Sequence, residues 1–362
     1  MGLFTKSKKT QDLNNINDTS FSTTNSINTI NSLTSNQSNS TIASKKKISR
    51  NDIKINQIGD GVSGKVDLYR SRSSPDFKYA VKTYHSKEMY ESKSEYKDRV
   101  LYEYNTLHNL HHENIIQVYK YDVSLNGNTI KTFMEAGSPN LYDLIKHVPV
   151  SKLDPLGMLC IWKQICQGIR YLHLQDICHR DLKLDNLIVD IPNRTVKIID
   201  LVTAADVHNN QLAIGLVGSP SYFAPETLER IRYDGKKADI WSLGIILYYL
   251  LNKKFPWKQA KIQDERYKAF LSLNPNYLSS SSDLPPPILN ESGYEIGKPS
   301  VLRYLPSESW PLTSQIFESD PEKRCGIEEF FTNDWFTNIK YCHSDIRCGI
   351  NHTIVFKDHE NA

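Results

Sequence analysis

The spacing of apolar residues changes near residue 137, and this change restricts the chain to a fold with two unlike parts. Before it, short stretches alternate between apolar and polar residues, as the strands of a sheet do. Beyond it, apolar residues recur at helical spacing, most clearly from Leu156 to Leu172. The expected strands are 53–58, 66–70, 77–84, 115–121 and 129–134, and the expected main helix is 86–110. We therefore predict an α+β fold, in which a small antiparallel sheet with one main helix precedes a larger, mainly helical part.

Three stretches depart from this pattern. Residues 1–50 are mainly Asn, Ser, Thr and Lys, which bury too little apolar surface to offset chain entropy, so a disordered tail is expected. Residues 272–308 contain runs of Ser and Pro with little periodicity and are interpreted as an insertion loop. Residues 338–362 are expected to form a C-terminal tail. The folded domain is thus predicted at 53–337, with its two parts at about 53–136 and 140–337.

Charge and composition exclude some classes of protein. A net charge of +3 is too balanced for a nucleic-acid-binding protein, so no nucleic-acid partner is expected. No apolar run approaches the roughly 20 residues that cross a bilayer, so no transmembrane segment is expected. The six cysteines form no CxxC pair and most lie in apolar surroundings, which is typical of reduced thiols. A cytoplasmic location is therefore predicted.

The segment His179–Asn186 holds the highest density of chemical function in the chain. Asp181 is a candidate base for a hydroxyl nucleophile, Arg180 places a cation beside it, and Asn186 is a candidate metal ligand five residues on. Phosphoryl transfer from a nucleotide needs this combination, because catalysis there is mostly positioning and neutralisation of charge. The full H-R-D-L-x-x-x-N pattern is specific, whereas an isolated His-Arg-Asp would indicate only a turn or a surface ion pair.

A glycine-rich stretch precedes this segment by more than a hundred residues. Gly59, Gly61 and Gly64 form the pattern G-x-G-x-x-G-x-V, which ends at Val66 and begins just after Ile58. Alone this pattern is weak, because glycine loops also serve dinucleotide-binding folds. Here a strand both precedes and follows it, which favours a hairpin lid whose backbone N–H groups close over phosphates.

A lysine and a carboxylate are expected below this lid. Lys82 and Ala80 should point to the same face of the third strand, with Lys82 as a clamp for the α- and β-phosphates. Such a lysine needs a carboxylate partner, and Glu103 on the following helix is the first choice. The competing carboxylates lie in a more polar stretch: Glu91, Glu95 and Asp98.

A metal site is predicted at the end of an apolar strand. Asp200 follows residues 196–199 and should be exposed at the strand tip, where it can bind Mg²⁺. Asn186 offers a second oxygen, and Mg²⁺ favours few protein oxygens combined with substrate phosphates. Each residue alone could serve a turn or a loop, but the ordered set of motifs is not explained that way.

In this order the motifs resemble those of the eukaryotic protein kinase family, of the serine/threonine type, over roughly residues 53–337. Three later motifs agree with the resemblance: Ala224-Pro225-Glu226, Asp239 to Gly244, and Asp320 to Arg324. It implies a bilobal fold, ATP and Mg²⁺ as cofactors, protein substrates, and adenine contacts from Met134, Glu135 and Ala136. It also implies a buried ion pair between Glu226 and Arg324, and contacts of the Ser219 hydroxyl with Asp181 and Lys183.

The resemblance implies roles for individual residues. Lys183, two residues after Asp181, indicates transfer to Ser or Thr, because in the family a lysine there contacts the γ-phosphate. Arg180 offers a docking point for an activation-loop phosphate, and so for an upstream activating kinase. The opposite expectation is constitutive activity with Arg180 merely hydrogen-bonded. The phosphate-accepting candidates are Thr203, Ser219 and Ser221.

One departure from the family leaves a second function open. The family's Asp-Phe-Gly is Asp200-Leu201-Val202 here, and a β-branched residue restricts the backbone where glycine is usual. We expect Asp200 still to bind Mg²⁺ while the movement of this loop is restricted. The alternative is a nucleotide-binding pseudokinase that serves as a scaffold.

A narrower resemblance concerns a fungal group within the family. Its members regulate nutrient permeases and ion transporters at the plasma membrane. The resemblance is carried by residues 233–235, 255–258 and 264–270. It implies peripheral association with membrane transporters.

Overall fold

The computed structural model describes residues 48–61, 63–137, 139–278, 283–343, 346–350 and 352. Positions 1–47, for which a disordered N-terminal tail was predicted, lie outside these residues. The serine run of the predicted insertion loop, 279–282, and positions 344, 345, 351 and 353–362 of the C-terminal tail also lie outside them.

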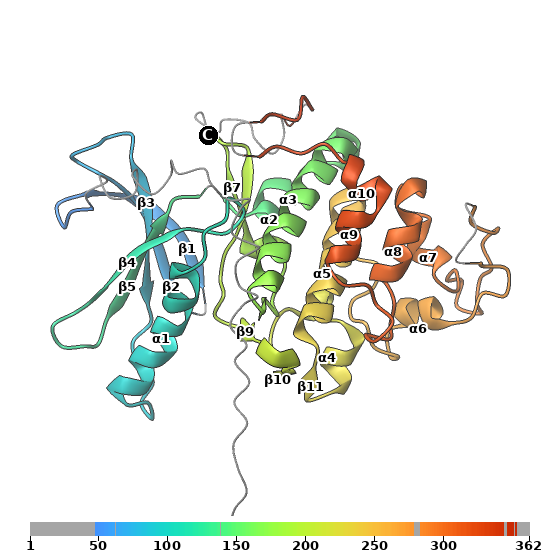
Figure 1. The fold of residues 1–362 in the computed structure, drawn as a ribbon, viewed down its shortest axis with the longest axis horizontal. Coiled ribbons are helices and arrows are strands. Elements are labelled where there is room, and N and C mark those ends of the chain that lie inside the picture. The colour runs from blue at the N-terminus through green and yellow to red at the C-terminus, as the bar shows by residue number, and fades with distance from the viewer. Residues whose placement is uncertain are drawn as a thin grey trace, which may run out of the picture. The chain divides into compact units, whose positions relative to one another are not determined.

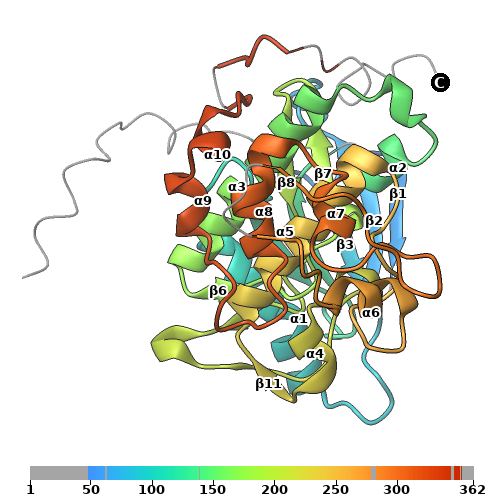
Figure 2. The ribbon, with the colours of Figure 1, turned by 90° about the vertical axis from the view of Figure 1, so that its right-hand side faces the viewer.

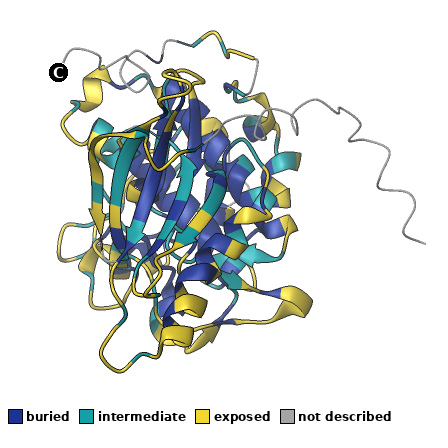
Figure 3. Cartoon of the chain, turned by 90° about the vertical axis from the view of Figure 1, so that its left-hand side faces the viewer, coloured by how far each residue is buried: buried dark blue, intermediate teal, exposed yellow. Residues whose placement is uncertain are grey.

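The first part of the described chain is a five-stranded antiparallel sheet with the order β1-β2-β3-β5-β4 (Figure 1). The five expected strands are present. Their bounds are β1 Ile53–Gly61, β2 Gly64–Arg70, β3 Lys78–Tyr84, β4 Val118–Val123 and β5 Ile130–Glu135. In Figure 3 the inner strands carry most of the buried positions. All nine residues of the edge strand β1 are exposed or intermediate.

One helix packs on this sheet, and it is shorter than expected. Helix α1 spans Lys93–His108 and begins at Lys93 rather than at residue 86. The start is set by a capping box, in which the Ser92 side chain accepts from the Glu95 backbone while the Glu95 side chain accepts from the Ser92 backbone. These two bonds satisfy donors that a helix end leaves unpaired, so the helix starts where the serine lies.

The second part is built around two long helices, α3 at Pro155–Leu174 and α5 at Gly235–Asn252 (Figures 1 and 2). Asp154 caps α3 and Asp234 caps α5 through side-chain bonds to the first turn. The Trp162 indole, fully buried on α3, donates to the Leu243 carbonyl of α5 at 2.9 Å. The predicted apolar stripe of α3 is largely buried, except that Leu156 is 58% exposed in its first turn.

Shorter elements surround these two helices. They are α2 Leu141–Ile145, η2 Val150–Lys152, β6 Ile177–Cys178, η3 Leu184–Asn186, β7 Leu187–Asp190, β8 Thr195–Ile198, β9 Ala205–Asp206, η4 His208–Asn210, β10 Ala213–Ile214, η5 Pro220–Tyr222, α4 Pro225–Glu229, β11 Arg232–Tyr233, α6 Glu265–Leu271, α7 Pro299–Leu302, η6 Ser307–Ser309, α8 Trp310–Ile316, α9 Glu328–Thr332 and α10 Asp334–Asn338. None of the helices in the described ranges has the length and apolarity that crossing a bilayer requires. This mixture of a small sheet and a helical part confirms the predicted α+β, bilobal fold.

The sheet and the helical part are joined by backbone pairing around Asn114. Ile116 N donates to Ile198 O at 3.0 Å, and Ile198 N donates to Asn114 O at 2.9 Å. The buried Asn114 amide also donates to Val196 O at 2.9 Å. Strand β8 is thereby fixed against the segment between α1 and β4, and β8 leads directly to Asp200.

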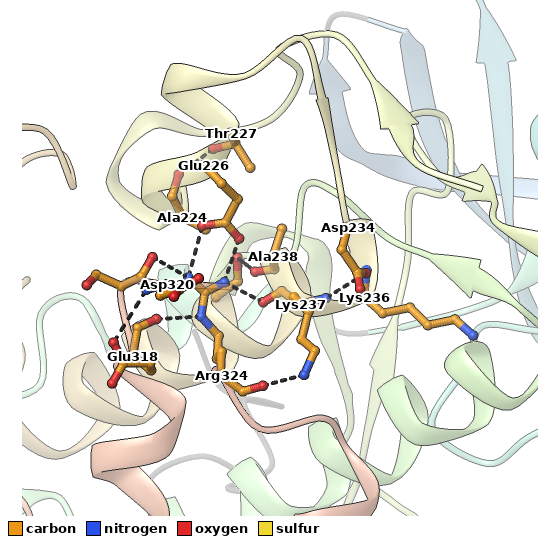
Figure 4. A network of polar contacts seen from close by, with 12 residues as sticks. Ala224, Glu226, Thr227, Asp234, Lys236, Lys237, Ala238, Glu318, Asp320 and Arg324 are labelled. Atoms are coloured by element: carbon orange, nitrogen blue, oxygen red, sulfur yellow. Dashed lines mark hydrogen bonds and ion pairs between the residues drawn. The ribbon is translucent and has the colours of Figure 1, made fainter. Parts of the chain in front are cut away.

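The ion pair that the resemblance implied is present. Figure 4 shows the guanidinium of Arg324 facing the carboxylate of Glu226, with N–O distances of 2.6 and 2.9 Å. The Arg324 side chain is fully buried and that of Glu226 is 1% exposed. Arg324 also donates to the backbone carbonyls of Glu318 and Lys237, each at 2.8 Å. The charge-paired guanidinium therefore ties α4 to α5 and to the segment before α9.

Candidate active site

Lys82 and Glu103 form a buried ion pair between β3 and α1. Lys82 Nζ donates to Glu103 Oε2 at 2.8 Å and to Oε1 at 3.0 Å, and both side chains are less than 10% exposed. The competing carboxylates have other contacts. Glu91 pairs with Arg99, Glu95 belongs to the capping box, and Asp98 accepts from Ser94. Of the carboxylates considered from the sequence, Glu103 is therefore the one that holds Lys82.

A tyrosine that the sequence reading did not single out completes this pair. Tyr84 Oη donates to Glu103 Oε2 at 2.7 Å, and the Lys82 ammonium lies 5.0 Å from the Tyr84 ring centroid. Burial, followed by the charge of Glu103, raises the pKa of Tyr84 far above its ordinary value, so the hydroxyl stays a donor. Tyr84 is two residues after Lys82 on the same strand, so strand periodicity was the signal that could have found it.

Tyr84→Phe is expected to lower kcat/KM for ATP about three- to tenfold, because Glu103 loses one of the three hydrogen bonds that it accepts while Lys82 remains bound to it. Steady-state kinetics of phosphoryl transfer at varied ATP would measure this. Tyr79→Phe is the matched control: it removes a hydroxyl from the same strand, but that hydroxyl donates to Asp52. Equal kcat/KM for Tyr84→Phe and the unaltered chain would contradict the role of Tyr84.

The glycine-rich hairpin between β1 and β2 uses its glycines for different reasons. A Cβ on Gly64 would lie 2.3 Å from Thr83 O, so this glycine is required by the close approach of β3. A Cβ on Gly61 would meet nothing within 4 Å in the described chain, so the space over the site is open there. The contact with β3 thus gives Gly64 a structural reason of its own to be a glycine. His85, which the sequence reading missed, contacts Gly61 O through Nε2 at 3.0 Å and steadies the hairpin.

The segment expected to contact adenine follows directly from the sheet register. Ala80 pairs with Met134 and Tyr79 with Glu135, so Met134 and Glu135 lie at the end of β5, next to Ala80. Ala80 is buried, and Glu135 and Met134 are half-buried. The Glu135 carboxylate pairs with Lys197 at 3.1 Å, while its backbone N–H donates to Gln117 O. The Glu135 side chain is therefore already bound to a residue of β8.

Asp181 lies at the centre of a compact polar cluster. Its Oδ1 accepts from Ser219 Oγ at 2.9 Å, and its Oδ2 accepts from Lys183 Nζ at 2.8 Å. Lys183 Nζ also donates to Ser219 Oγ at 2.8 Å, so the three side chains close a triangle. The contacts that the resemblance implied for the Ser219 hydroxyl are therefore present.

Asn186 is fixed against the same carboxylate. Its amide nitrogen donates to Asp181 O at 2.8 Å and to Asp181 Oδ2 at 3.3 Å. The nitrogen is thereby assigned to protein acceptors, and the amide oxygen remains the atom suited to a cation. Ile199 N donates to Asn186 O at 3.0 Å, which holds Asn186 close to the strand end at Asp200.

The backbone of His179 and Arg180 is held by a buried carboxylate from α5. Asp239 is 1% exposed and accepts from His179 N at 2.7 Å and from Arg180 N at 2.9 Å. Its Oδ2 also contacts His173 Nε2 on α3 at 3.0 Å. Sequence reading used Asp239 only as a landmark of the resemblance, because nothing local links it to residues sixty positions earlier.

Asp200 places a buried carboxylate oxygen close to Lys82. Its Oδ1 is buried, and within the described residues it has no hydrogen-bond partner; Lys82 Nζ lies 3.9 Å away. Its backbone is left-handed, with φ of 65°, a conformation that aspartate tolerates better than most residues. Leu201 is fully buried in the main core, which fixes the segment in the position that turns Asp200 toward Lys82. Val202 is 40% exposed and lies outside the left-handed region, so the sharp turn occurs at Asp200 rather than at the residue where glycine is usual.

Arg180 is hydrogen-bonded to the segment that it was expected to control. Its guanidinium donates to Gly215 O at 2.8 Å, to Ile214 O, and to Tyr233 Oη at 3.1 Å. Strands β10 and β11 pair at the same place, so the arginine is bonded to this small two-stranded sheet. Arg180 was expected either to receive an activation-loop phosphate or to be merely hydrogen-bonded, and in the structure it is hydrogen-bonded. Two of the candidate phosphate acceptors are also engaged, because Thr203 donates to His179 O and Ser219 belongs to the Asp181 triangle.

A buried lysine–glutamate pair and a His-Arg-Asp loop thus belong to one site, together with Asp200, whose Oδ1 accepts no hydrogen bond from the described residues. The family described as protein kinase domain matches residues 53–336. The chain belongs to the protein kinase family. The match covers both the sheet with α1 and the helical part, and so includes every residue of the site described above.

The relatives of this family member include several fungal serine/threonine kinases. Serine/threonine-protein kinase oca2 of Schizosaccharomyces pombe is 34% identical, over 80% of this chain and 49% of its own length. In Saccharomyces cerevisiae, serine/threonine-protein kinase PRR2 is 32% identical over 79% of this chain and 42% of its own length. The Nitrogen permease reactivator protein of the same yeast is 33% identical, over 79% of this chain and 39% of its own length. The chain therefore spans less than half the length of these relatives.

Proposed function

We propose that the chain is a protein serine/threonine kinase that transfers the γ-phosphoryl group of ATP to Ser or Thr hydroxyls of protein substrates. The observation that most supports it is the triangle of Asp181, Lys183 and Ser219, because it presents a carboxylate and an ammonium group to the same point. A hydroxyl nucleophile needs the first group to accept its proton, and a phosphoryl group needs the second to neutralise its charge.

Each residue of the site then has a role in the transfer. Asp181 orients the substrate hydroxyl and accepts its proton as the new O–P bond forms and the bond to ADP breaks. Lys183 neutralises charge on the moving phosphoryl group. Lys82, held by Glu103, positions the α- and β-phosphates, which prepares the γ-phosphate for in-line attack.

We assign the nucleotide to the space between the hairpin and the Asp181 loop. Ile58, Gly59, Gly61, Gly64 and Val66 form the lid, since they belong to the paired strands β1 and β2. Ala80 contributes the apolar wall of the adenine pocket, and the backbone of Met134, Glu135 and Ala136 its polar edge. The open space at Gly61 supports this placement, because a backbone without a Cβ lets phosphates approach.

We assign Mg²⁺ to Asp200 and Asn186. The buried Asp200 Oδ1 supports this, because a buried carboxylate oxygen without a hydrogen-bond partner in the described chain suits a cation. Two protein oxygens leave coordination positions for phosphates and water, as Mg²⁺ prefers. When bound, the ion neutralises phosphate charge and fixes the phosphate geometry.

The test is phosphate transfer from radiolabelled ATP to a generic Ser/Thr protein substrate. The unaltered chain should label the substrate, and Lys82→Ala should lower the rate by at least about a hundredfold, because its clamp and the Glu103 ion pair are lost together. Lys78→Ala is the matched control, since Lys78 is an exposed lysine on the same strand. Nucleotide binding without transfer above the Lys82→Ala level would establish the pseudokinase alternative instead.

We further propose that the chain acts in the regulation of membrane transporters from a cytoplasmic location. The relative named as a nitrogen permease reactivator supports the choice of process. None of the six cysteines, all of which lie in the described residues, forms a disulfide, as the reducing cytoplasm favours, which supports the location. Peripheral association with transporters, and control by an upstream kinase that acts on the activation segment, belong to the same proposal.

A further inference from the structure

Four side chains that bind metals in other proteins meet far from the active site. Cys160 lies on α3, and Cys342, Cys348 and His352 lie in the segment after α10. One ligand atom from each residue lies within 4.8 Å of the other three. The Sγ atoms of Cys342 and Cys348 are 3.4 Å apart, and His352 Nε2 lies 3.6 Å from the first and 2.9 Å from the second.

These distances fit a tetrahedral metal site. With Zn–S about 2.3 Å and Zn–N about 2.0 Å, two sulfurs on one zinc lie about 3.8 Å apart, and a sulfur and a nitrogen about 3.5 Å apart. The Cys342–Cys348 and Cys342–His352 separations, 3.4 and 3.6 Å, are within about 0.4 Å of these values, and the Cys348–His352 separation, 2.9 Å, is about 0.6 Å shorter. Three thiolates and one imidazole form a soft donor set that selects Zn²⁺ over Mg²⁺ or Ca²⁺, and four protein ligands make a closed, structural site.

The cluster is enclosed by the protein. Cys160 and Cys342 are fully buried, His352 is 6% exposed, and Cys348 is half-buried. Helix α3 also makes room for the histidine, because a Cβ on Gly157 would lie 3.2 Å from His352 Nδ1. Gly157 and Cys160 are three residues apart and share one face of α3, so this face both admits the imidazole and contributes the thiol.

Neighbouring contacts hold the same segment on the same face of α3. Lys163 Nζ donates to three backbone carbonyls, those of Phe336 and Thr337 at 2.9 Å and that of Ile339 at 2.8 Å. Gln167 Nε2 donates to Tyr341 Oη at 3.0 Å, and Arg347 donates to the carbonyls of Pro192 and Asn193 in the turn between β7 and β8. The segment is therefore pinned on both sides of the cluster, so the ligands are brought together by more than their own contacts.

We propose that Cys160, Cys342, Cys348 and His352 bind one Zn²⁺ ion, which fastens the segment after α10 to helix α3. On binding, the three thiols release their protons to solvent and the imidazole binds as the neutral form through Nε2. The ligands span a sequence separation of 182 residues between Cys160 and Cys342, so the ion closes a long loop of the chain. Because α3 runs to the strand that precedes His179, the fastened segment braces the helix behind the catalytic loop.

The test is the zinc content of the full chain, expressed without a polyhistidine tag and purified in the presence of a thiol reductant. Inductively coupled plasma mass spectrometry should find close to one zinc ion per chain. Cys348→Ser and Cys160→Ala should each lower zinc to background after dialysis against a chelator at a concentration that leaves the unaltered chain loaded. Cys166→Ala is the matched control: it removes a buried thiol from the same helix outside the cluster, and zinc should stay at one equivalent.

Two further measurements cover variants that fail to fold. Replacement of zinc by Co²⁺ in the unaltered chain should give the visible absorption of a tetrahedral cobalt site with thiolate charge-transfer bands. His352→Cys should retain the metal and shift those bands, because four cysteines also form a tetrahedral site. Three results would each overturn the proposal. They are absence of zinc from the unaltered chain purified with reductant, retention of zinc by Cys348→Ser, and a Cys342–Cys348 disulfide that persists in the presence of the reductant.

Discussion

Asp181→Asn is expected to lower the rate of phosphoryl transfer by about a hundred- to ten-thousandfold and to leave ATP binding nearly unchanged. The carboxylate is the proton acceptor of the proposed reaction, and such groups contribute about this factor. The amide is nearly isosteric and can still accept one hydrogen bond from Lys183 or Ser219. The backbone carbonyl that accepts from Asn186 is unaltered. The site should therefore keep its shape while losing its base.

Single-turnover transfer and fluorescent-nucleotide binding would separate the two effects. Asp190→Asn is the matched control, because it makes the same chemical change at a carboxylate whose oxygens accept from Asn193 in the turn after β7. Its transfer rate should stay within about twofold of the unaltered chain. Full activity in Asp181→Asn would exclude the proposed base, and equal loss in Asp190→Asn would indicate a general loss of folded protein.

Arg324→Ala is expected to lower the free energy of unfolding by about 3–5 kcal/mol, the largest change in stability that we predict. The substitution removes a fully buried guanidinium and leaves Glu226, which is 1% exposed, as an unpaired charge in the core. Chemical denaturation monitored by circular dichroism would measure the change, provided that the unfolding transition is reversible. Arg324 contacts Glu226 and the backbone carbonyls of Glu318 and Lys237, to none of which we assign the nucleotide, so residual folded protein should still bind ATP.

Two further variants test whether burial of the charge is the cause of this loss of stability. Arg170 forms an equally well-aligned pair with Glu328, with N–O distances of 2.9 and 2.7 Å, but both side chains are at least one-third exposed. Arg170→Ala should therefore cost about 1 kcal/mol or less. The double variant Glu226→Leu with Arg324→Met should be more stable than Arg324→Met alone, because it leaves no buried charge. A small loss for Arg324→Ala, equal to that of Arg170→Ala, would contradict the account.

Sequence reading predicted the elements whose signals are local. The aromatic and β-branched residues of β3 and the apolar stripe on α3 gave those elements near their observed bounds, because both signals lie within a few neighbouring residues. The start of α1 was missed by seven residues, since the polar stretch before Ser92 has helical composition and only the capping box marks the true boundary. Local periodicity does not contain that information.

The residues of the site also fall into those that local sequence motifs predict and those that they do not. The residues that carry chemistry lie in short motifs, so Lys82, Asp181, Asn186 and Asp200 could be chosen before their positions in space were known. Their supports could not, because Tyr84 and Asp239 act across elements that only the fold brings together. The proposed zinc ligands were the hardest residues to predict from the sequence. Cys160 is 182 residues from Cys342, and the chain has no CxxC pair that would have indicated a metal site.

The position of Lys163 bears on where this domain can be divided. Its ammonium lies below the end of α10, and the carbonyls it binds include those of Phe336 and Thr337 in the last turn of that helix. Burial lowers the pKa of Lys163, so its protonated form depends on these acceptors. A chain cut at Phe336, where the family match stops, would lose the acceptors at Thr337 and Ile339, which are two of the three carbonyls that bind the ammonium. The smallest self-sufficient domain therefore extends past the boundary that similarity to the family alone would draw.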